Sequence, residues 1–147
     1  MEKKKIVLTL SKVFPVTHSL AGEPTNFEAK LTAGTKIHTI RANTAGVWDN
    51  RFKEIDEGRK VLCVREWTGK PYNSEQREFA RFEKIGLQHI QMFNGPIVQI
   101  KVEGKLVPLE EVAAHDGLSV DQFLEWFFGD GQTYFEGVVI HFTDFRY

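Results

Sequence analysis

Hydrophobic and polar positions alternate in short blocks along the chain, and the period of alternation changes several times. Alternating apolar residues, and runs of aromatic and β-branched residues, are typical of strands in a small sheet. Four stretches predict strands: residues 6–10, residues 60–67, a hairpin over 97–107 that turns at Glu103-Gly104-Lys105, and residues 133–142. Residues 77–93 mix strand-like and helical signals, so the pattern assigns them to neither.

Helical spacing and capping signals predict short helices between these strands. Thr25-Asn26-Phe27-Glu28 matches a capping box, which predicts a helix over 26–33 that ends at Gly34. Trp48, Phe52 and Ile55 are spaced as on one helical face, and Gly58 follows them. The stretch that follows Gly34 and holds Ile37 and Ile40 also predicts a strand. The elements therefore come in the order strand, helix, strand, helix, strand over the first 67 residues.

Two further helices are predicted near the end of the chain. Leu109 to Ala114 predicts a short helix that stops at His115-Asp116-Gly117. Ser119 and Gln122 form a second capping box, and it opens an amphipathic helix. Its predicted core-facing residues are Phe123, Trp126 and Phe127. Short helices that interrupt the strands without strict alternation indicate an α+β fold, which we expect to be a small mixed barrel.

Length and composition indicate a single domain over residues 1–147. The 147 residues are 41% hydrophobic and 12% aromatic, which is enough for one sizeable core. No run of eighteen apolar residues exists, and the apolar stretch after Lys3-Lys4-Lys5 is short. We therefore expect a soluble, cytoplasmic protein with no membrane partner. The single cysteine, Cys63, lies in an apolar strand and is expected to serve packing.

Charge is distributed unevenly, although the net charge is only −1. Residues 30–70 hold nine basic and five acidic residues, whereas residues 103–147 hold two basic and nine acidic ones. This asymmetry favours a local anionic ligand, such as one or two phosphates, over a long duplex. The alternative is that the basic residues form a solvated face.

The densest group of reactive side chains lies between residues 34 and 41. Gly34-Thr35-Lys36-Ile37-His38-Thr39-Ile40-Arg41 combines a turn glycine with an amine, an imidazole, hydroxyls and a guanidinium. A strand that starts after a turn presents polar side chains at a sheet edge, where a ligand reaches them. The alternative is a half-exposed strand whose polar side chains are only solvated.

These residues resemble a known family. The pattern Gly34-x-Lys36-x-x-Thr39-Ile40-Arg41, a strand at 60–67, and Asp116-Gly117 before a Ser-capped helix and a final aromatic strand resemble the ASCH domain of the PUA-like superfamily. The resemblance covers about residues 27–142. It implies a PUA-like pseudo-barrel with a cleft that faces the Lys-Thr-Arg strand, and work on nucleotides or nucleic acid.

Within that family, the chain is similar to small bacterial amidohydrolases that remove the acetyl group from N4-acetylcytidine. The resemblance implies that Lys36 is the catalytic lysine, Thr39 the nucleophile and Asp116 the catalytic acid. The acid of those enzymes is a glutamate, so Asp116 is one methylene shorter.

The chemistry of these three groups sets its own requirements. A threonine hydroxyl needs a base to take its proton as it attacks a carbonyl, and a lysine serves only when neutral, which requires a lowered pKa. Asp116 beside the amine would raise that pKa, unless it binds a different group such as the substrate's amino nitrogen. Positions 36 and 39 of a regular strand point to opposite faces, so the chain must still be turning at Lys36 if it is to meet Thr39.

Five further residues are candidates for binding substrate or phosphate: Arg41, His38, Arg51, Trp67 and Lys70. Arg41 either grips a phosphate or pairs with a structural carboxylate such as Glu28. Trp48 and the aromatic turn 67–72 either stack a base or pack in the core. The five histidines show no i, i+2 or i, i+4 pairing, so we expect no metal and no other cofactor.

The sequence therefore predicts a protein that binds a nucleoside, a nucleotide or a base of RNA in a polar cleft. Three functions remain open. The first is hydrolysis of an N4-acylated cytidine or a similar amide, and the second is noncatalytic RNA binding. The third, ribonuclease activity, would need a base and an acid at a phosphodiester, for which His38 is the only nearby candidate.

Overall fold

The structure, a computed structural model, describes residues 2–147 and forms an α+β fold with two sheets. Eight strands are present in this part of the chain: β1 (Lys4–Thr9), β2 (His38–Ala42), β3 (Lys60–Trp67), β4 (Gln76–Phe82), β5 (Gly86–Asn94), β6 (Val98–Val102), β7 (Lys105–Val107) and β8 (Tyr134–His141). Four α-helices accompany them: α1 (Phe27–Thr32), α2 (Val47–Asp56), α3 (Leu109–His115) and α4 (Val120–Phe128). A short 3-10 helix, Thr44–Gly46, precedes α2.

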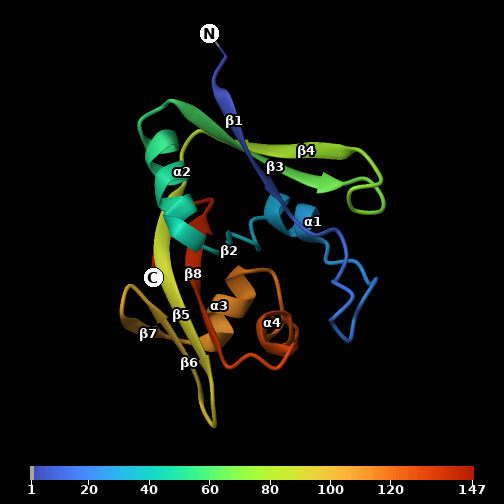
Figure 1. Cartoon of the computed structure of the whole chain (residues 1–147), viewed down its shortest axis with the longest axis vertical. Coiled ribbons are helices and arrows are strands. Elements are labelled where there is room, and N and C mark those ends of the chain that lie inside the picture. The colour runs from blue at the N-terminus through green and yellow to red at the C-terminus, as the bar shows by residue number, and fades with distance from the viewer. Residues whose placement is uncertain (1) are drawn as a thin grey trace.

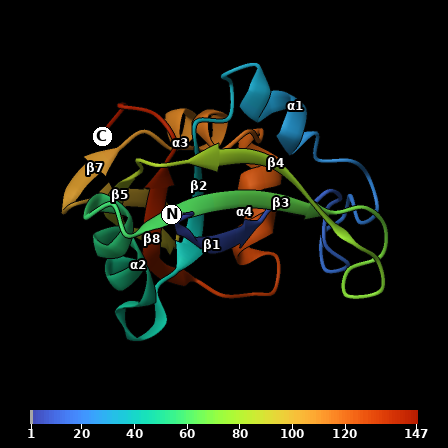
Figure 2. The same cartoon turned by 90° about the horizontal axis from the view of Figure 1, so that it is seen from above.

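The two sheets differ in size and in strand direction. The smaller sheet has the order β1-β3-β4, with β1 parallel and β4 antiparallel to β3. The larger sheet is antiparallel and has the order β2-β8-β5-β6-β7. Figures 1 and 2 show the small sheet lying over the end of β2 and β8, with its strands running across theirs. Helices α3 and α4 lie beside the larger sheet (Figure 1).

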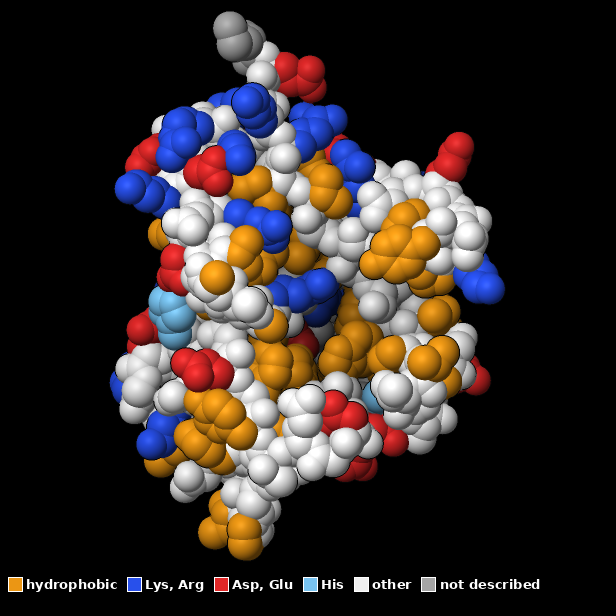
Figure 3. All heavy atoms as spheres, viewed as in Figure 1, with side chains coloured by type: hydrophobic (Ala, Val, Ile, Leu, Met, Phe, Trp, Pro, Cys, Tyr) orange, Lys and Arg blue, Asp and Glu red, His pale blue; other side chains and the backbone are white. Residues whose placement is uncertain are grey.

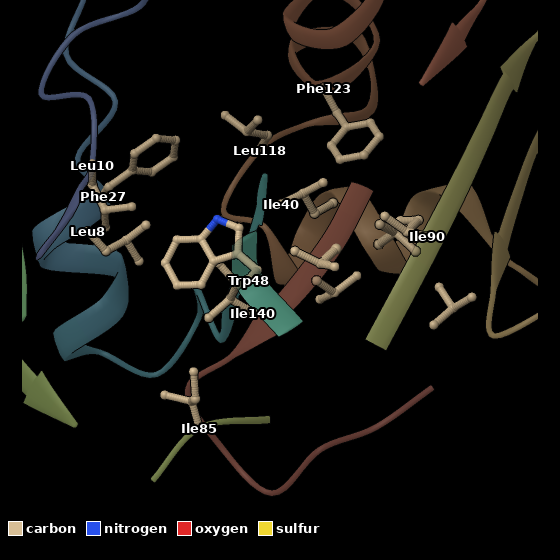
Figure 4. Close-up of a cluster of buried hydrophobic side chains, with 14 of the residues drawn as sticks. Leu8, Leu10, Phe27, Ile40, Trp48, Ile85, Ile90, Leu118, Phe123 and Ile140 are labelled. Carbon is tan, nitrogen blue, oxygen red and sulfur yellow. The ribbon is translucent and has the colours of Figure 1, made fainter. Parts of the chain in front are cut away.

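One hydrophobic core joins both sheets and the helices. Leu62 and Val64 of β3 are fully buried, as are Ile90 of β5 and Ile140 of β8. Figure 4 shows Trp48 of α2 in the same cluster as Ile90 and Ile140. Removing so much apolar surface from water is the main force that holds the two sheets together.

Most elements expected from the pattern are confirmed: the strand over 60–67 matches β3 at both ends, and the ends of the others differ by at most four residues. The unassigned stretch 77–93 contains most of β4 and β5. Its signals conflict because β4, with sequence QREFARF, lies at the edge of the small sheet and buries no residue fully. A strand at a sheet edge that is not fully buried does not need a strict alternation of apolar and polar residues.

The two capping boxes have opposite outcomes. The Ser119–Gln122 box is present, with both reciprocal hydrogen bonds, at the start of α4. The prediction of the Thr25–Glu28 box is wrong, because this box does not form. Asn26 occupies the N-cap position of α1 without a side-chain hydrogen bond, and the Thr25 hydroxyl donates instead to the Ser11 carbonyl oxygen at 2.7 Å. A long-range partner therefore replaced the local one.

The α+β class is confirmed, but the expected barrel does not close. In the part of the chain that the structure describes, β1 and β4 are the outer strands of one sheet, and β2 and β7 those of the other. No strand ladder in these residues joins the two sheets, so they remain separate. Among residues 2–147, no helix has the length and apolar character needed to cross a membrane.

Candidate functional site

A polar cavity of about 160 Å³ lies where the segment leading into β2 meets the end of α3. Its lining residues are Leu10, Ser11, Phe27, Lys36, Thr39, Ile40, Arg41, Asp116, Leu118, Trp126 and Phe127. Lys36, Thr39, Arg41 and Asp116 were all expected from the sequence to form a site, and the structure brings these four together. Figure 3 shows Lys and Arg side chains in a hollow near the centre of one face, bordered by hydrophobic side chains.

The turn after α1 places Lys36 in this cavity. Gly34 has a φ of 79°, which is costly for other residues, and the backbone N–H groups of Thr35 and Lys36 then donate to the Lys30 carbonyl oxygen. Strand β2 begins only at His38, so Lys36 precedes the regular strand. The chain is thus still turning at Lys36, and its side chain shares the cavity with Thr39 and Arg41, which lie on one face of β2.

The end of α3 supplies the carboxylate. Asp116 is the C-cap residue of this helix, and Gly117 follows with a φ of 84°. The Lys36 Nζ atom donates to the Asp116 backbone carbonyl oxygen at 2.7 Å and lies 3.3 Å from its Oδ1 atom. The Ile37 N–H also donates to the His115 carbonyl oxygen, which joins the two segments through their backbones.

Burial dominates the electrostatics of Lys36. Its side chain is only 2% exposed, and its Nζ atom lies 4.2 Å from the centre of the Phe27 ring. Loss of hydration lowers the pKa of Lys36, while the charge and hydrogen bond of Asp116 raise it and the positive charge of Arg41 lowers it. The net shift is downward, which is the direction that makes a neutral amine more accessible near neutral pH.

Arg41 is held by the small sheet. Its Nη2 atom donates to the Thr9 carbonyl oxygen at 2.8 Å, at the end of β1. The alternative pairing with Glu28 is wrong, because Glu28 pairs with Arg77. Burial lowers the pKa of Arg41, yet a guanidinium stays charged at physiological pH. The cavity therefore has a fixed positive charge that is free to bind an anion or a developing oxyanion with its remaining N–H groups.

The cavity continues into a wider groove of about 830 Å³. Leu10, Ser11 and Arg41 line both, so the two spaces meet at these residues. Trp67 and Lys70, two of the predicted binding residues, lie in the groove rather than in the cavity.

The outer end of the groove carries an exposed aromatic pair and basic side chains. The Trp67 and Tyr72 rings lie 5.1 Å apart, and Tyr72 is 88% exposed with a φ of 64°. Lys12 and Lys70 also line the groove, and none of its lining residues is acidic. An exposed tyrosine held in a left-handed backbone conformation is costly, which is typical of functional positions.

Two predicted residues lie elsewhere. His38 is fully buried and does not line the cavity, because its side chain lies on the opposite face of β2 from Thr39. It lies 3.3 Å from Asp116 Oδ1, behind the cavity wall. Arg51 lies on α2 over the Trp48 ring, outside both the cavity and the groove. His38 is thus poorly placed to act directly on a phosphodiester in the cavity.

Two residues that the sequence did not single out complete the surroundings of His38. Its Nε2 atom lies 2.6 Å from the Tyr147 hydroxyl, which in turn lies 3.1 Å from His115 Nδ1. No local pattern points to this contact, because 109 residues separate His38 from Tyr147. Trp126, expected to face the core, also forms part of the cavity wall.

Within residues 2–147, no group of three or more His, Cys, Asp or Glu side chains is arranged to hold a metal ion. No family model, curated protein or solved structure matches this chain.

Proposed function

We propose that this protein is an ASCH-type hydrolase that cleaves the amide of an N4-acylated cytidine, with Thr39 as nucleophile and Lys36 as base. The observation that carries the proposal is the meeting of a buried amine, a hydroxyl and a carboxylate in one cavity beside a guanidinium. Buried ionisable groups with shifted pKa values in a cavity are typical of catalytic sites. A purely structural ion pair would not require a cavity or a neighbouring hydroxyl.

The family assignment has its own support. Gly34, Lys36, Thr39 and Arg41 stand at the spacing of the ASCH motif, and three of them line the cavity. We propose that the two sheets are a form of the PUA-like pseudo-barrel in which the sheets remain separate. A cytidine derivative as substrate agrees with the cytoplasmic location expected from the sequence.

The first chemical step uses the lowered pKa of Lys36. Neutral Lys36 takes the proton of the Thr39 hydroxyl as this oxygen attacks the amide carbonyl carbon. The negative charge that develops on the carbonyl oxygen is stabilised by Arg41, whose guanidinium is already fixed in place. The bond from carbon to N4 then breaks, and N4 leaves with the proton that Lys36 had taken. Acetyl-Thr39 and cytidine result.

The second step restores the enzyme. Lys36 takes a proton from a water molecule that attacks the ester of Thr39, and the Thr39 oxygen leaves with a proton from Lys36. Acetic acid forms and ionises at neutral pH, so each turnover releases one proton. Asp116 accepts a hydrogen bond from Lys36 and holds the amine in the cavity that Thr39 also lines. Its second oxygen is available to accept a hydrogen bond from the substrate's N4 amide.

The groove favours a second candidate, a noncatalytic RNA-binding module. Arg41, Lys12 and Lys70 would contact phosphates, while Trp67 and Tyr72 would stack on bases. The two candidates share one ligand chemistry, a nucleotide with its base toward the cavity. They differ in whether a bond is broken there.

Incubation of the purified protein with N4-acetylcytidine tests the proposal. We expect cytidine and acetate to form, and Thr39→Ala and Lys36→Met each to lose at least about a thousandfold in kcat/KM, as when a nucleophile or its base is removed. Matched controls are Thr133→Ala and Lys105→Met, at exposed positions outside the cavity. The hydrolase proposal is wrong if no product forms, or if Thr39→Ala retains full activity. Salt-sensitive binding of short RNA without product would then favour the second candidate.

A further inference from the structure

A chain of polar side chains leads from Asp116 at the cavity wall, through His38 and Tyr147, to His115, the last residue of α3. Asp116 Oδ1 lies 3.3 Å from His38 Nδ1, and His38 Nε2 lies 2.6 Å from the Tyr147 hydroxyl. The same hydroxyl lies 3.1 Å from Nδ1 of His115, which is half-buried at the end of α3. One end of the chain is therefore at the proposed active site, and the other is near solvent.

The surrounding structure fixes the middle of this chain. The backbone N–H of Tyr147 donates to Gln88 Oε1 at 3.0 Å, and Gln88 Nε2 donates to the Tyr147 carbonyl oxygen at 3.2 Å. These two bonds anchor the backbone of Tyr147 to β5. His38 is fully buried, so its ring reaches water only through its neighbours. Such a network is typical of a preorganised path rather than of an adaptable surface.

The Tyr147 hydroxyl allows two arrangements of protons. It has one proton but lies between two imidazole nitrogens, so it donates to one and accepts from the other. In the first arrangement Asp116 is protonated and donates to His38, His38 donates to Tyr147, and Tyr147 donates to His115. In the second arrangement Asp116 is ionised, and each contact has the opposite donor. His115 donates to Tyr147, Tyr147 donates to His38, and His38 donates to Asp116.

We propose that Asp116, His38, Tyr147 and His115 form a proton relay between the cavity and solvent. Each bridging proton moves one step: from Asp116 to His38 Nδ1, from His38 Nε2 to the Tyr147 oxygen, and from the Tyr147 hydroxyl to His115 Nδ1. His115 then releases a proton from Nε2 to water. One proton enters at Asp116 and one leaves at His115, and no side chain in the middle holds a net charge afterwards.

The charged and titratable groups around the relay suit this transfer. Lys36 and Arg41 line the same cavity as Asp116, and the Lys36 Nζ atom lies 3.3 Å from Asp116 Oδ1. Burial and His38 lower the pKa of His115, although Glu111 on α3 raises it, so His115 gives up a proton readily near neutral pH. Burial raises the pKa of Tyr147, with smaller effects of Glu111 and Asp116 in the same direction, so its hydroxyl remains protonated.

His141 lies beside the relay without taking part in it. Its ring lies 5.6 Å from that of His38, on β8. Burial, together with His38, Arg146 and His115, lowers the pKa of His141 to about 3, so it is neutral at physiological pH. Its Nε2 donates to Gln88 Oε1, and its Nδ1 has no hydrogen-bond partner. A proton that reaches His38 therefore has Tyr147 as its hydrogen-bonded exit.

The use of the relay during turnover rests on the proposed hydrolysis. Each turnover releases one proton as acetic acid ionises beside Asp116, and the relay would carry that proton out while the product still fills the cavity. The relay itself does not depend on the identity of the substrate. Its existence can thus be measured on the free protein.

Nuclear magnetic resonance of the histidine rings tests the relay without any substrate. We expect the His38 ring N–H in the wild type to exchange with water by way of Tyr147 and His115, because His38 is fully buried and Tyr147 links it to the half-buried His115. Tyr147→Phe removes only the bridging oxygen, so it should slow exchange of the His38 ring N–H with water about tenfold or more. Tyr134→Phe on β8, outside the relay, is the matched control and should leave exchange unchanged.

A second variant distinguishes loss of the relay from a local change in packing at Tyr147. His115→Phe keeps an aromatic ring at the end of α3 but removes the outer nitrogen, so it should slow the same exchange. An unchanged or faster exchange rate in either variant overturns the relay. If exchange slows as expected while N4-acetylcytidine is not hydrolysed, the relay stands and the proposed function fails.

Discussion

The amine of Lys36 lies 2.7 Å from the backbone carbonyl oxygen of Asp116 and 3.3 Å from its carboxylate, although 80 residues separate the two in sequence. The backbone contact holds the amine at the end of α3 independently of the charge on the carboxylate. This arrangement keeps Lys36 in the cavity in both its charged and its neutral form. Both forms are needed if Lys36 is to take up and return a proton.

The lowered pKa of Lys36 predicts a pH-dependent contribution to stability. Lys36 binds fewer protons when folded than when unfolded, so its contribution to the free energy of unfolding rises with pH up to the ordinary value of 10.5. The difference in unfolding free energy between wild type and Lys36→Met should therefore grow in favour of wild type from neutral pH toward 10.5, by at most about 1.4 kcal/mol per pH unit. Urea denaturation at several pH values measures it.

The comparison with Lys36→Met cancels other groups that titrate in this range, such as Cys63, whose pKa burial raises. Lys105→Met is a suitable control because Lys105 is exposed on β7. A pH-independent difference between wild type and Lys36→Met would contradict the lowered pKa.

Asp116→Asn should lower the pKa of Lys36 further. The carboxylate raises that pKa through its charge and its hydrogen bond, and an amide has no charge to do so. We expect the Lys36 Nζ signal to titrate at lower pH in this variant, as measured by nuclear magnetic resonance. Asp121→Asn, exposed on α4, should not move that signal. A shift toward higher pH in Asp116→Asn would show that Asp116 acts on Lys36 in another way.

Tyr72→Ala should weaken binding of single-stranded RNA without affecting turnover of the free nucleoside. Tyr72 lies at the outer end of the groove and not in the cavity, so only a longer ligand would reach it. Loss of one stacked base costs about 1–3 kcal/mol, or roughly fivefold to more than a hundredfold in Kd. Fluorescence anisotropy with a short labelled RNA measures this. Equal loss in Tyr134→Ala would point to nonspecific contacts instead.

Gly137→Ala should destabilise the fold at the pairing of β2 with β8. A Cβ atom at Gly137 would overlap the backbone carbonyl oxygen of Arg41, and backbone atoms in a strand pair have little room to move. We expect a loss of about 1–3 kcal/mol in unfolding free energy, as for other overpacked sites. Gly95→Ala is the matched control, because a Cβ there meets no atom within 4 Å. Equal stability of the two variants in urea denaturation would contradict this contact.

The pattern of the sequence was most informative where interactions are local. The Ser119 cap and the helix end at Gly34 were correctly predicted, because each depends on residues only a few positions apart. The Thr25 cap was wrongly predicted because the Thr25 hydroxyl donates instead to the carbonyl oxygen of Ser11, which is distant in sequence. Edge strand β4 was missed for the related reason that its surroundings, not its own pattern, make it a strand.

The candidate site divides in the same way. The sequence by itself determined that Lys36, Thr39 and Arg41 lie on one short segment after a turn, since seven peptide bonds from Gly34 to Arg41 keep them near one another. Asp116 was expected at the site only from the family resemblance, and the tertiary structure decided its contact with Lys36 and that His38 faces away toward Tyr147. Those contacts depend on the pairing of β2 with β8 and on the docking of α3. Both bury apolar residues that are far apart in the sequence, so no local pattern predicts them.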